Sequence, residues 1–247
     1  MENKIKVFLE EDIPNEDITS MGTVDKNTQI IAEIHAVEEM IFSGTQIIKS
    51  IFKFISNVDL LVSDGDSLKP GDSICRIQGN AIQILSRERV LLNLIQRMSG
   101  IATNVRKYVK LAKQNDVLIL DTRKTTPGLR RFEKYAVTCG GGFNHRMGLF
   151  DRILIKDNHL AAKKCQQGQE LENFLSKIVS YYASSYLIEV EIASLEQLEP
   201  ALRANVDAVL LDNFSPEEIQ EAVSINKQKA VLEASGGINE NTLQEFA

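Results

Sequence analysis

The chain has 247 residues, of which 43% are hydrophobic and 25% are charged, a mixture typical of folded proteins and not of disordered or collagen-like chains. Its formal net charge of −6 disfavours the broadly basic surface of a nucleic-acid-binding protein. Because no run of 18 apolar residues occurs and the N-terminal segment is polar and acidic, we expect neither a membrane helix nor a secretory signal peptide.

The cysteines Cys75, Cys139 and Cys165 are scattered and form no C-x-x-C pair. This usage argues against disulfides and against a structural zinc site, and it favours a reducing compartment. We therefore expect a cytoplasmic protein with no membrane and no nucleic acid among its partners.

The N-terminal part of the chain predicts a mixed α and β domain, because helical and strand-like apolar spacings follow one another between turn signals. In chain order the expected elements are an amphipathic segment over 1–9, a polar turn over 12–19, a strand over 29–37, a helix over 44–54, and short strands over 60–62 and 74–77 joined by tight turns.

The longest helical pattern runs from residue 87 to residue 114. Its apolar residues recur at three- and four-residue steps over several turns, which is the spacing of one helix face. Gly100 interrupts the pattern beside Ser99, at a cost of about 1 kcal/mol relative to alanine. We expect this glycine to allow a close backbone contact or a break. The helix closes an N-terminal domain that we place at 1–112.

A second domain is expected over 113–247, where short apolar runs alternate with helical segments. Runs of Val, Ile, Leu and Ala without alternation indicate parallel strands buried on both faces. Two helix starts carry capping boxes, Ser194 with Gln197 and Ser215 with Glu218. The predicted strands lie at 117–120, 153–155, 187–192, 208–211 and 230–232. This order predicts an (α/β) barrel or a doubly wound sheet.

Positive charge is concentrated in residues 121–160. Eight basic and four acidic residues give this window +4, against −10 for the remainder, and it also holds His145 and His159. A cationic island on an acidic chain suits a small polyanionic ligand, whereas a solvated charged surface is the alternative that charge alone leaves open. Lys124 or Lys156 as a Schiff-base lysine is a further alternative, which the neighbouring arginines disfavour.

Polar residues follow each predicted strand of the second domain. Basic side chains come first, at 121–124 and Lys156, and carboxylates come later, at 189–191, Asp212 and Glu233. Because the carboxyl ends of parallel strands open at one mouth, we expect these groups to form one site.

Two glycine-containing segments are candidates for anion binding. Ser235, Gly236 and Gly237 follow the last predicted strand and can present backbone N–H groups to a phosphate. The run 140–142 is expected to be either a flexible anion loop or a mobile lid.

Several sequence motifs are shared with one known family. The most specific is the run D-T-R-K-T-T-P-G-L-R at 121–130. The others are E-D-I at 11–13, D-I-T at 17–19, E-R-V-L-L-N at 88–93, S-G-I-A-T at 99–103, E-K-Y-A-V at 133–137, G-G-G-F-N-H-R-M-G-L at 140–149, K-D-N-H at 156–159, I-E-V-E at 188–191, L-D-N at 211–213 and E-A-S-G-G at 233–237. Together they cover nearly the whole chain and resemble the carboxylating nicotinate-nucleotide pyrophosphorylases, also called quinolinate phosphoribosyltransferases.

The resemblance implies an α/β fold, with an N-terminal α/β sandwich domain followed by an open, incomplete (α/β) barrel. It implies phosphoribosyl transfer from 5-phosphoribosyl-1-pyrophosphate (PRPP) to quinolinate with loss of CO2, giving nicotinate mononucleotide and pyrophosphate in NAD biosynthesis. It also implies Mg²⁺ bound with PRPP, no organic cofactor, and a homodimer with shared active sites or a hexamer of such dimers.

The resemblance also implies roles for particular residues. Lys124, Lys156, Glu191 and Asp212 are the expected catalytic residues, and the two carboxylates lie on the ribose and Mg²⁺ side. The substrate-binding residues expected in addition are Arg89, reaching into the neighbouring subunit's site, Thr122, Arg123, His145 and Arg146 around quinolinate, and Ser235, Gly236 and Gly237 around phosphate.

Two alternatives remain at this stage. One is a molybdenum-associated homologue of the same fold, although the intact N-H-R and K-D-N-H stretches favour quinolinate. The other is a non-catalytic paralogue that binds phosphate ligands. This second alternative arises because the chain ends at Phe246 and Ala247, so that we expect the barrel to lack its final strand and the glycine-containing loop that completes the phosphate site.

Overall fold

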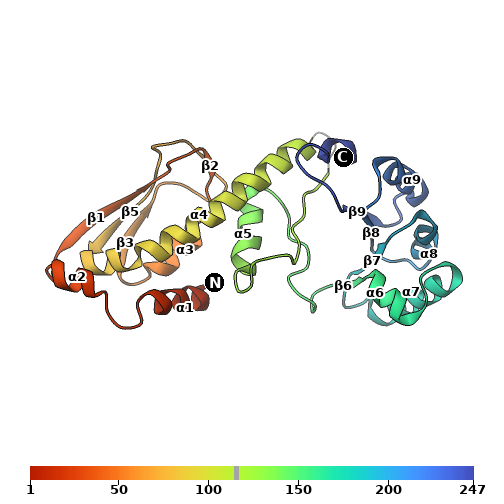
Figure 1. Ribbon diagram of the computed structural model, residues 1–247, viewed down its shortest axis with the longest axis horizontal. Helices are drawn as coiled ribbons and strands as arrows, with labels where there is room; N and C mark the ends of the chain where they lie inside the picture. Colours follow the sequence, from red (N-terminus) through yellow and green to blue (C-terminus); the bar gives the residue numbers. More distant parts are fainter. Residues whose placement is uncertain (114–116) are drawn as a thin grey trace. The chain divides into compact units, whose positions relative to one another are not determined.

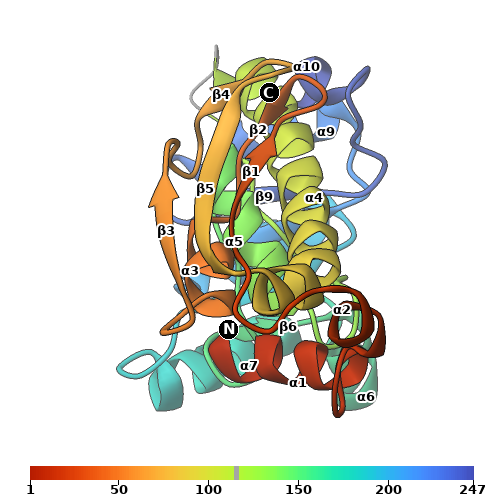
Figure 2. The same ribbon diagram turned by 90° about the vertical axis from the view of Figure 1, so that its left-hand side faces the viewer.

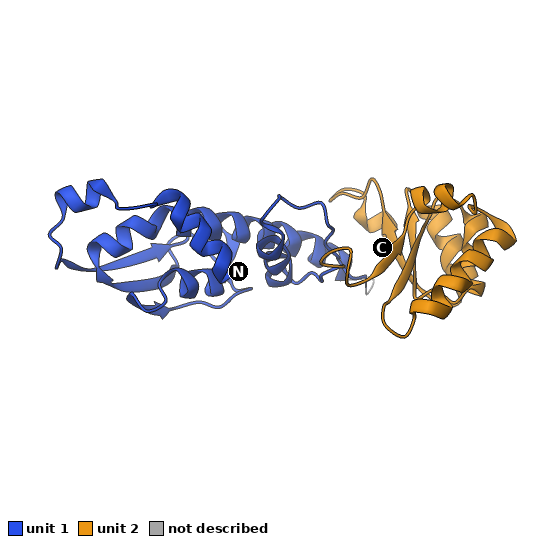
Figure 3. Cartoon of the chain, turned by 90° about the horizontal axis from the view of Figure 1, so that it is seen from below, with its two compact units in different colours: residues 1–145 blue, residues 146–247 orange. Residues whose placement is uncertain are grey.

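The computed structural model describes residues 1–113 and 117–247, which fall into two units. Unit 1 is Met1–His145 and unit 2 is Arg146–Ala247, coloured separately in Figure 3. Each unit has its own hydrophobic core. The domain boundary expected after residue 112 stays a prediction. The division into units lies further along the chain because helix α5 (Arg130–Gly140) packs against helix α4 (Ala81–Ala112).

Unit 1 is built on a three-stranded antiparallel sheet of order β1-β5-β3. Its strands are β1 (Gln29–His35), β3 (Ser56–Leu60) and β5 (Ser73–Asn80), with Ala32 opposite Ile77 and Val58 opposite the same residue. Figure 2 shows the three strands side by side with α4 next to them. The smaller elements of the unit are α1 (Glu2–Asp12), α2 (Ile18–Thr23), the paired strands β2 (Met40–Ile41) and β4 (Ser67–Leu68), and α3 (Thr45–Ile51).

The polar turn expected over 12–19 is shorter in the structure. Asp17 caps α2, because its carboxylate accepts hydrogen bonds from the backbone N–H groups of Thr19 and Ser20 at 3.1 and 3.0 Å. The D-I-T motif is therefore a helix start, since an Asp at this position satisfies N–H groups that the helix leaves unpaired.

Helix α4 runs along the small sheet and extends beyond it, where it packs against α5 (Figure 1). It begins six residues before the predicted start, because the Asn80 side chain accepts a hydrogen bond from the N–H of Gln83 at 3.3 Å and caps it. The helix passes through Gly100 without a break, and a Cβ placed there meets no atom within 4 Å. The expectation of a break or a close contact at Gly100 is wrong. The predicted end at Gln114 lies outside the described residues.

The glycine run 140–142 ends helix α5 and packs against α4. A Cβ on Gly140 would lie 2.6 Å from the carbonyl oxygen of Ala102, and Gly141 takes the left-handed conformation with φ 94°. Arg106 of α4 also donates to the carbonyl oxygen of Gly140 at 2.8 Å. The expected anion loop or lid is therefore wrong, because this segment is held in the packed contact between two helices.

The strand expected over 117–120 is reduced to one bridge. Leu120 pairs with Phe143 in parallel, supported by hydrogen bonds from Phe143 N to Ile119 O at 2.8 Å and from Asp121 N to Phe143 O at 3.0 Å. This bridge places the segments that begin at residues 121 and 144 next to each other, and both segments contain candidate site residues.

Unit 2 contains a parallel sheet of order β6-β7-β8-β9. Its strands are β6 (Ile153–Ile155), β7 (Ile188–Ile192), β8 (Ala208–Asp212) and β9 (Val231–Ser235), and its helical segments are α6 (Asp157–Lys163), α7 (Gly168–Tyr182), η2 (Leu195–Gln197), α8 (Leu198–Arg203), α9 (Pro216–Asn226) and α10 (Leu243–Phe246). Figure 1 shows α7, α8 and α9 on one face of this sheet. The predicted parallel strands at 153–155, 187–192, 208–211 and 230–232 are confirmed to within a few residues.

The strand β7 is not apolar on both faces as predicted. Ile188, Val190 and Ile192 belong to the core of unit 2, whereas Glu189 and Glu191 alternate with them. Since successive side chains of a strand point to opposite faces, the two glutamates share the face away from the apolar core. The alternation therefore brings carboxylates to one side of the sheet.

Both predicted capping boxes form. The Gln197 side chain accepts from Ser194 N at 3.2 Å, and the Ser215 hydroxyl accepts from Glu218 N at 3.2 Å. The three cysteines are free and buried. Among the helices of the described part of the chain, none combines the length and the apolar character needed to cross a membrane. The predicted fold class is confirmed: a small sheet domain precedes a parallel α/β unit whose four described strands form an open sheet.

Candidate functional site

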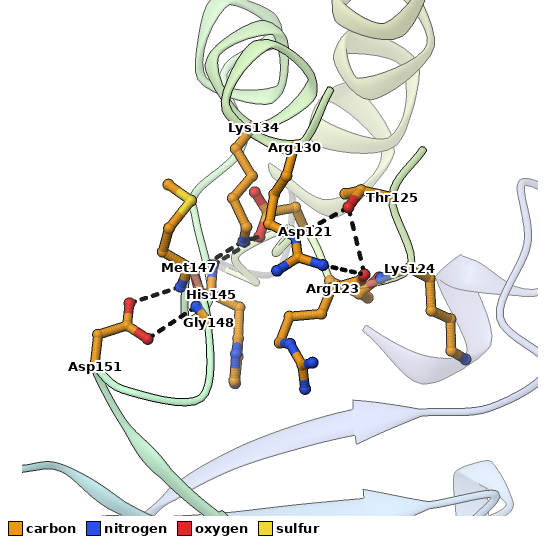
Figure 4. Close-up of polar contacts among 11 residues, drawn as sticks. Asp121, Arg123, Lys124, Thr125, Arg130, Lys134, His145, Met147, Gly148 and Asp151 are labelled. Atoms are coloured by element: carbon orange, nitrogen blue, oxygen red, sulfur yellow. Dashed lines mark hydrogen bonds and ion pairs between the residues drawn. The ribbon is translucent and has the colours of Figure 1, made fainter. Parts of the chain in front are cut away.

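The motif at 121–130, here called the cation loop, connects the Leu120 bridge to α5. Thr122 accepts a hydrogen bond from Lys124 N at 2.9 Å, and Thr125 N donates to Arg123 O at 2.9 Å. These local bonds turn the backbone tightly, and the Arg123 and Lys124 side chains extend away from α5 in Figure 4. The loop therefore presents two cations from adjacent positions.

Arg130 holds the loop at its other end. Its Nε donates to the Thr125 hydroxyl at 3.0 Å, and its Nη2 donates to the Arg123 carbonyl oxygen at 3.4 Å (Figure 4). Arg130 thus acts on the backbone of the loop. Within the described chain, the Nε atom of Arg123 is buried without a hydrogen-bond partner, so this guanidinium retains donor capacity for a ligand.

A buried ion pair lies beneath the loop. The Lys134 ammonium contacts Asp121 Oδ1 and donates to the His145 carbonyl oxygen at 3.0 Å, while His145 N donates to the same Asp121 oxygen at 2.9 Å. The two side chains are 1% and 7% exposed. This pair ties the start of the cation loop to α5 and to His145, as Figure 4 shows.

A second buried carboxylate anchors the outer part of the loop. Glu133 accepts from Arg97 Nη2 at 2.6 Å and from Thr126 N at 3.1 Å, and Arg97 also donates to the Thr126 hydroxyl at 2.6 Å. Burial by itself raises the pKa of Glu133, but the hydrogen bonds from Arg97 and Thr126 together lower the pKa below its ordinary value. The carboxylate is therefore held in its charged form.

A hollow of about 330 Å³ adjoins the cation loop inside unit 1. Thr122, Lys124, Thr126 and Lys134 are among the residues that line it. A larger groove of about 900 Å³ lies elsewhere in the unit, between β1 and α4, but its lining is mainly apolar and includes Glu33, Glu39 and Glu88. The smaller hollow is lined by three basic residues and two carboxylates, Asp121 and Glu133, so that Lys124 is its basic residue outside the two ion pairs described above. This weakly positive balance suits an anionic ligand better than the acidic lining of the larger groove.

In unit 2 the expected residues lie at the carboxyl ends of neighbouring strands. Lys156 follows β6 and its ammonium lies 2.6 Å from Glu191 Oε2 on β7. Asp212 ends β8 opposite Ser235 at the end of β9. The site residues that the sequence places after separate strands are thus brought to one edge, and Lys156 and Glu191 form an ion pair that sequence reasoning did not foresee.

The segment after β9 makes a tight backbone turn against Asn213. Gly236 has φ 96°, and a Cβ there would lie 2.1 Å from Asn213 Oδ1. Asn213 itself has φ 59° and donates its backbone N–H to Ser235 O at 2.7 Å. Only glycine fits this close approach, which supports the expected use of Gly236 for its backbone and not for a side chain.

His159 has a structural role within unit 2. Its Nδ1 accepts the backbone N–H of Lys156 at 2.8 Å and so completes the capping box of α6. This fixes Lys156 at the junction of β6 and α6. The K-D-N-H motif therefore positions its lysine through its histidine.

Arg146 and Arg89 are the other expected substrate-binding residues. Arg146 is buried and begins unit 2. Arg89 lies on α4 with its guanidinium 4.0 Å from Glu88, in a groove of about 360 Å³ that Arg97 also lines.

Three functional candidates were missed by sequence reasoning, namely Asp121, Lys134 and Glu133 as buried anchors. Lys134 lies on the side of α5 away from its apolar stripe of Phe132, Ala136 and Val137. It is buried because the segments at 121 and 145 cover it. Helical periodicity cannot predict this burial, since it comes from segments outside the helix.

A loop that presents Arg123 and Lys124, together with parallel strands that end in lysine and carboxylates, is typical of an α/β enzyme with anionic substrates. The family models described as the N-terminal and C-terminal domains of quinolinate phosphoribosyl transferase match residues 17–99 and 101–247. The chain belongs to the quinolinate phosphoribosyltransferase family.

Individual relatives agree with this assignment. The probable nicotinate-nucleotide pyrophosphorylase [carboxylating] of Bacillus subtilis is 42% identical over 97% of this chain and 82% of its own length. The nicotinate-nucleotide pyrophosphorylase [carboxylating] of Mycobacterium leprae is 38% identical over 90% of this chain and 79% of its own. The crystal structure of NadC from Streptococcus pyogenes is 35% identical with a TM-score of 0.92, over 99% of this chain and 86% of that one.

Proposed function

We propose that this protein catalyses phosphoribosyl transfer from PRPP to quinolinate, with decarboxylation to nicotinate mononucleotide in NAD biosynthesis. The observation that carries the proposal is the cation loop at 121–130, with Arg123 and Lys124 presented on a backbone held by buried carboxylates. The names of the relatives support this reaction over the molybdenum-associated and the non-catalytic alternatives.

Quinolinate is a dianion, and its recognition falls to the basic residues around the loop. Arg123, His145, Arg146 and Lys156 contact its carboxylates, and Lys124 lies near both substrates. Arginine suits this task because its planar donors match a carboxylate in pairs. The buried Nε of Arg123 supports the assignment, because a bound carboxylate would satisfy it.

The phosphoribosyl group binds at the carboxyl ends of the parallel strands of unit 2. Glu191 and Asp212 face the ribose, where their charge stabilises the positive charge that develops on the sugar as the leaving group departs. Ser235, Gly236 and Gly237 donate backbone N–H groups to phosphate. The tight turn at Gly236, which has φ 96° and no room for a side chain, supports a backbone role for this segment.

The carboxylates also fit the Mg²⁺ that PRPP chemistry uses. Mg²⁺ prefers oxygen ligands and keeps waters and substrate phosphates in its shell. Glu191 and Asp212 supply carboxylate oxygens, and one oxygen of each already accepts a hydrogen bond, from Lys156 at 2.6 Å and from Asn213 at 2.9 Å. The ion, held largely by the substrate, would neutralise charge on the departing pyrophosphate.

The bonds of the reaction balance without a protein nucleophile or an organic cofactor. The lone pair of the pyridine nitrogen forms a bond to C1 of the sugar, while the bond from C1 to the pyrophosphate oxygen breaks and its electron pair leaves with pyrophosphate. The bond from ring C2 to its carboxylate then breaks, CO2 departs, and the electron pair left on C2 takes a proton. The residues bind, orient and stabilise charge.

The proposal includes a cytoplasmic homodimer with shared sites, or a hexamer of such dimers, in which Arg89 enters the partner's site. The exposure of Arg89 supports this, since 65% of its side chain is accessible and its contact with Glu88 is long. An exposed ion pair of this kind contributes little to stability, which leaves the arginine available for another role.

Formation of nicotinate mononucleotide from quinolinate and PRPP tests the proposal. We expect product only when both substrates are present. Arg123→Ala should weaken quinolinate binding by about 2–5 kcal/mol, because the partner carboxylate loses a desolvated charge pair. Arg131→Ala, an exposed residue of α5, is the matched control and should bind quinolinate as the parent does. A chain that forms no product, or an Arg123→Ala variant with unchanged affinity, would contradict the assignment.

A further inference from the structure

Lys134 is a buried ammonium that the proposed reaction does not use. It is among the largest fully buried side chains of the protein, with 1% of its residue surface exposed. Burying a charge costs several kcal/mol unless partners compensate it, and replacing a buried ion pair by apolar residues is often neutral for stability. Stability alone therefore does not explain a lysine here.

The contacts of Lys134 connect three segments of unit 1. Lys134 lies on α5. Its ammonium forms an ion pair with Asp121 at the start of the cation loop and donates a hydrogen bond to the carbonyl oxygen of His145 at 3.0 Å. Asp121 Oδ1 also accepts the N–H of His145 at 2.9 Å. Both backbone polar groups of His145 are thus held by the pair.

The side chain of Asn144 completes the frame. When its amide is oriented to suit its neighbours, the nitrogen donates to Asp121 Oδ2 at 2.6 Å and to Lys134 O at 2.9 Å. Asp121 then uses both of its oxygens within the frame. Arg123 follows Asp121 by two residues, so these contacts fix the backbone near Arg123 relative to His145.

From this geometry we propose that Lys134 and Asp121 are positioning residues, which set the separation of Arg123 and His145 so that one ligand with two adjacent carboxylates contacts both. The inference rests on the proposed function and assigns the selection of a dicarboxylate over a monocarboxylate to this buried pair. The affinity of a ligand with a single carboxylate does not depend on that separation, because its carboxylate contacts only one of the two residues.

The test compares quinolinate with nicotinate, which lacks the second carboxylate, in calorimetric titrations of the whole chain. The measured quantity is the ratio of the two dissociation constants. In Asp121→Asn/Lys134→Met, which removes both charges while keeping similar shapes, we expect the preference for quinolinate to fall at least tenfold. Loss of stability alone lowers both affinities together and leaves the ratio unchanged.

The matched control is Glu172→Gln/Arg203→Gln, which removes an ion pair of 2.8 Å between α7 and α8. Its preference should stay within twofold of the parent. If the Asp121→Asn/Lys134→Met variant folds and keeps the parental preference, the inference is overturned. Should that variant fail to fold, Asn144→Ala decides, because Asn144 is exposed and uncharged: a threefold or greater loss of preference supports the inference, and a smaller change overturns it.

The parental protein separates the two proposals. If it does not prefer quinolinate over nicotinate, the proposed function fails. If it does and the variants keep that preference, only the positioning role fails.

Discussion

Glu133 shows how one buried carboxylate supports the candidate site. Its side chain is 11% exposed and joins Arg97 of α4 to Thr126 of the cation loop. Hydrogen bonds to a charged group contribute about 1.5–3 kcal/mol, more than those between neutral groups. The loop is thereby held to the long helix through a largely buried carboxylate, whose Arg97 partner is 47% exposed to water.

The lowered pKa of Glu133 gives its contribution to stability a pH dependence. A carboxyl group with a lower pKa in the folded state stabilises the fold above its ordinary pKa, and this stabilisation is lost as pH falls through the folded value. Relative to Glu133→Gln, we expect the parent to have a free energy of unfolding higher by about 1.5–3 kcal/mol near neutral pH. The difference should shrink as pH drops below 4.5.

Urea denaturation of the two proteins across this range measures the difference. Glu16→Gln serves as control, because this glutamate is exposed in the segment between α1 and α2. A difference between parent and Glu133→Gln that is constant from neutral to acid pH would show that the charge of Glu133 does not anchor the loop.

The basic residues proposed for the site were evident in the sequence, whereas the buried residues that anchor the loop were not. Arg123, Lys124 and Lys156 follow from their places after strands and from the family motif. Their fixed backbone depends on Asp121, Glu133 and Lys134, which sequence analysis counted only as charges in the island. Pairing between residues 13 positions apart, as in Asp121 and Lys134, is decided by tertiary packing.

At the level of elements, the contact between α4 and α5 depends on a glycine. Gly140 lets α5 approach until a Cβ would meet Ala102 O at 2.6 Å and Val105 Cβ at 2.7 Å. Backbone atoms cannot move aside as a flexible side chain can. The contact sets the direction of α5 and so the place of Lys134 and Glu133.

We expect Gly140→Ala to lower the free energy of unfolding by about 1–3 kcal/mol through overpacking. Gly100→Ala is a matched control in the same helix pair, because Gly100 is exposed on α4 and an added Cβ meets nothing. That control should stabilise the protein by up to about 1 kcal/mol through helix propensity. Chemical denaturation measures the free energy of unfolding of both variants. If Gly140→Ala and Gly100→Ala change it by the same amount, the packed contact at Gly140 is contradicted.

Helices and parallel strands were predicted better than their ends. The stripe of α4 was evident, but its start was missed because Asn80 as a cap was not weighed. The run 117–120 has strand composition, yet it forms only the Leu120 bridge, since its partner segment at 143 turns directly into the site. The glycine run was misread because Gly140 and Gly142 serve packing, which composition does not distinguish from flexibility.

For the molecule as a whole, the proposed reaction requires residues from both units. Each unit buries a separate apolar cluster, and the cation loop belongs to unit 1 whereas Glu191 and Asp212 belong to unit 2. The proposal of shared sites adds a second chain, whose Arg89 completes the site.

Mixing two inactive variants tests the sharing of sites. Arg89→Ala lacks the residue that enters the partner's site, and Lys156→Ala lacks a residue within its own. After subunit exchange, a heterodimer contains one site with neither substitution, so we expect activity to reappear. Exchange demonstrated by mass, without any recovered activity, would exclude a shared site that uses Arg89.

The fate of the quinolinate 2-carboxylate tests the central claim most directly. The account predicts that quinolinate labelled in this carboxylate releases one labelled CO2 for each nicotinate mononucleotide formed, and only when PRPP is present. Label in the 3-carboxylate should remain in the nucleotide. Label that stays in the 2-carboxylate of the product, or CO2 released without PRPP, would contradict it.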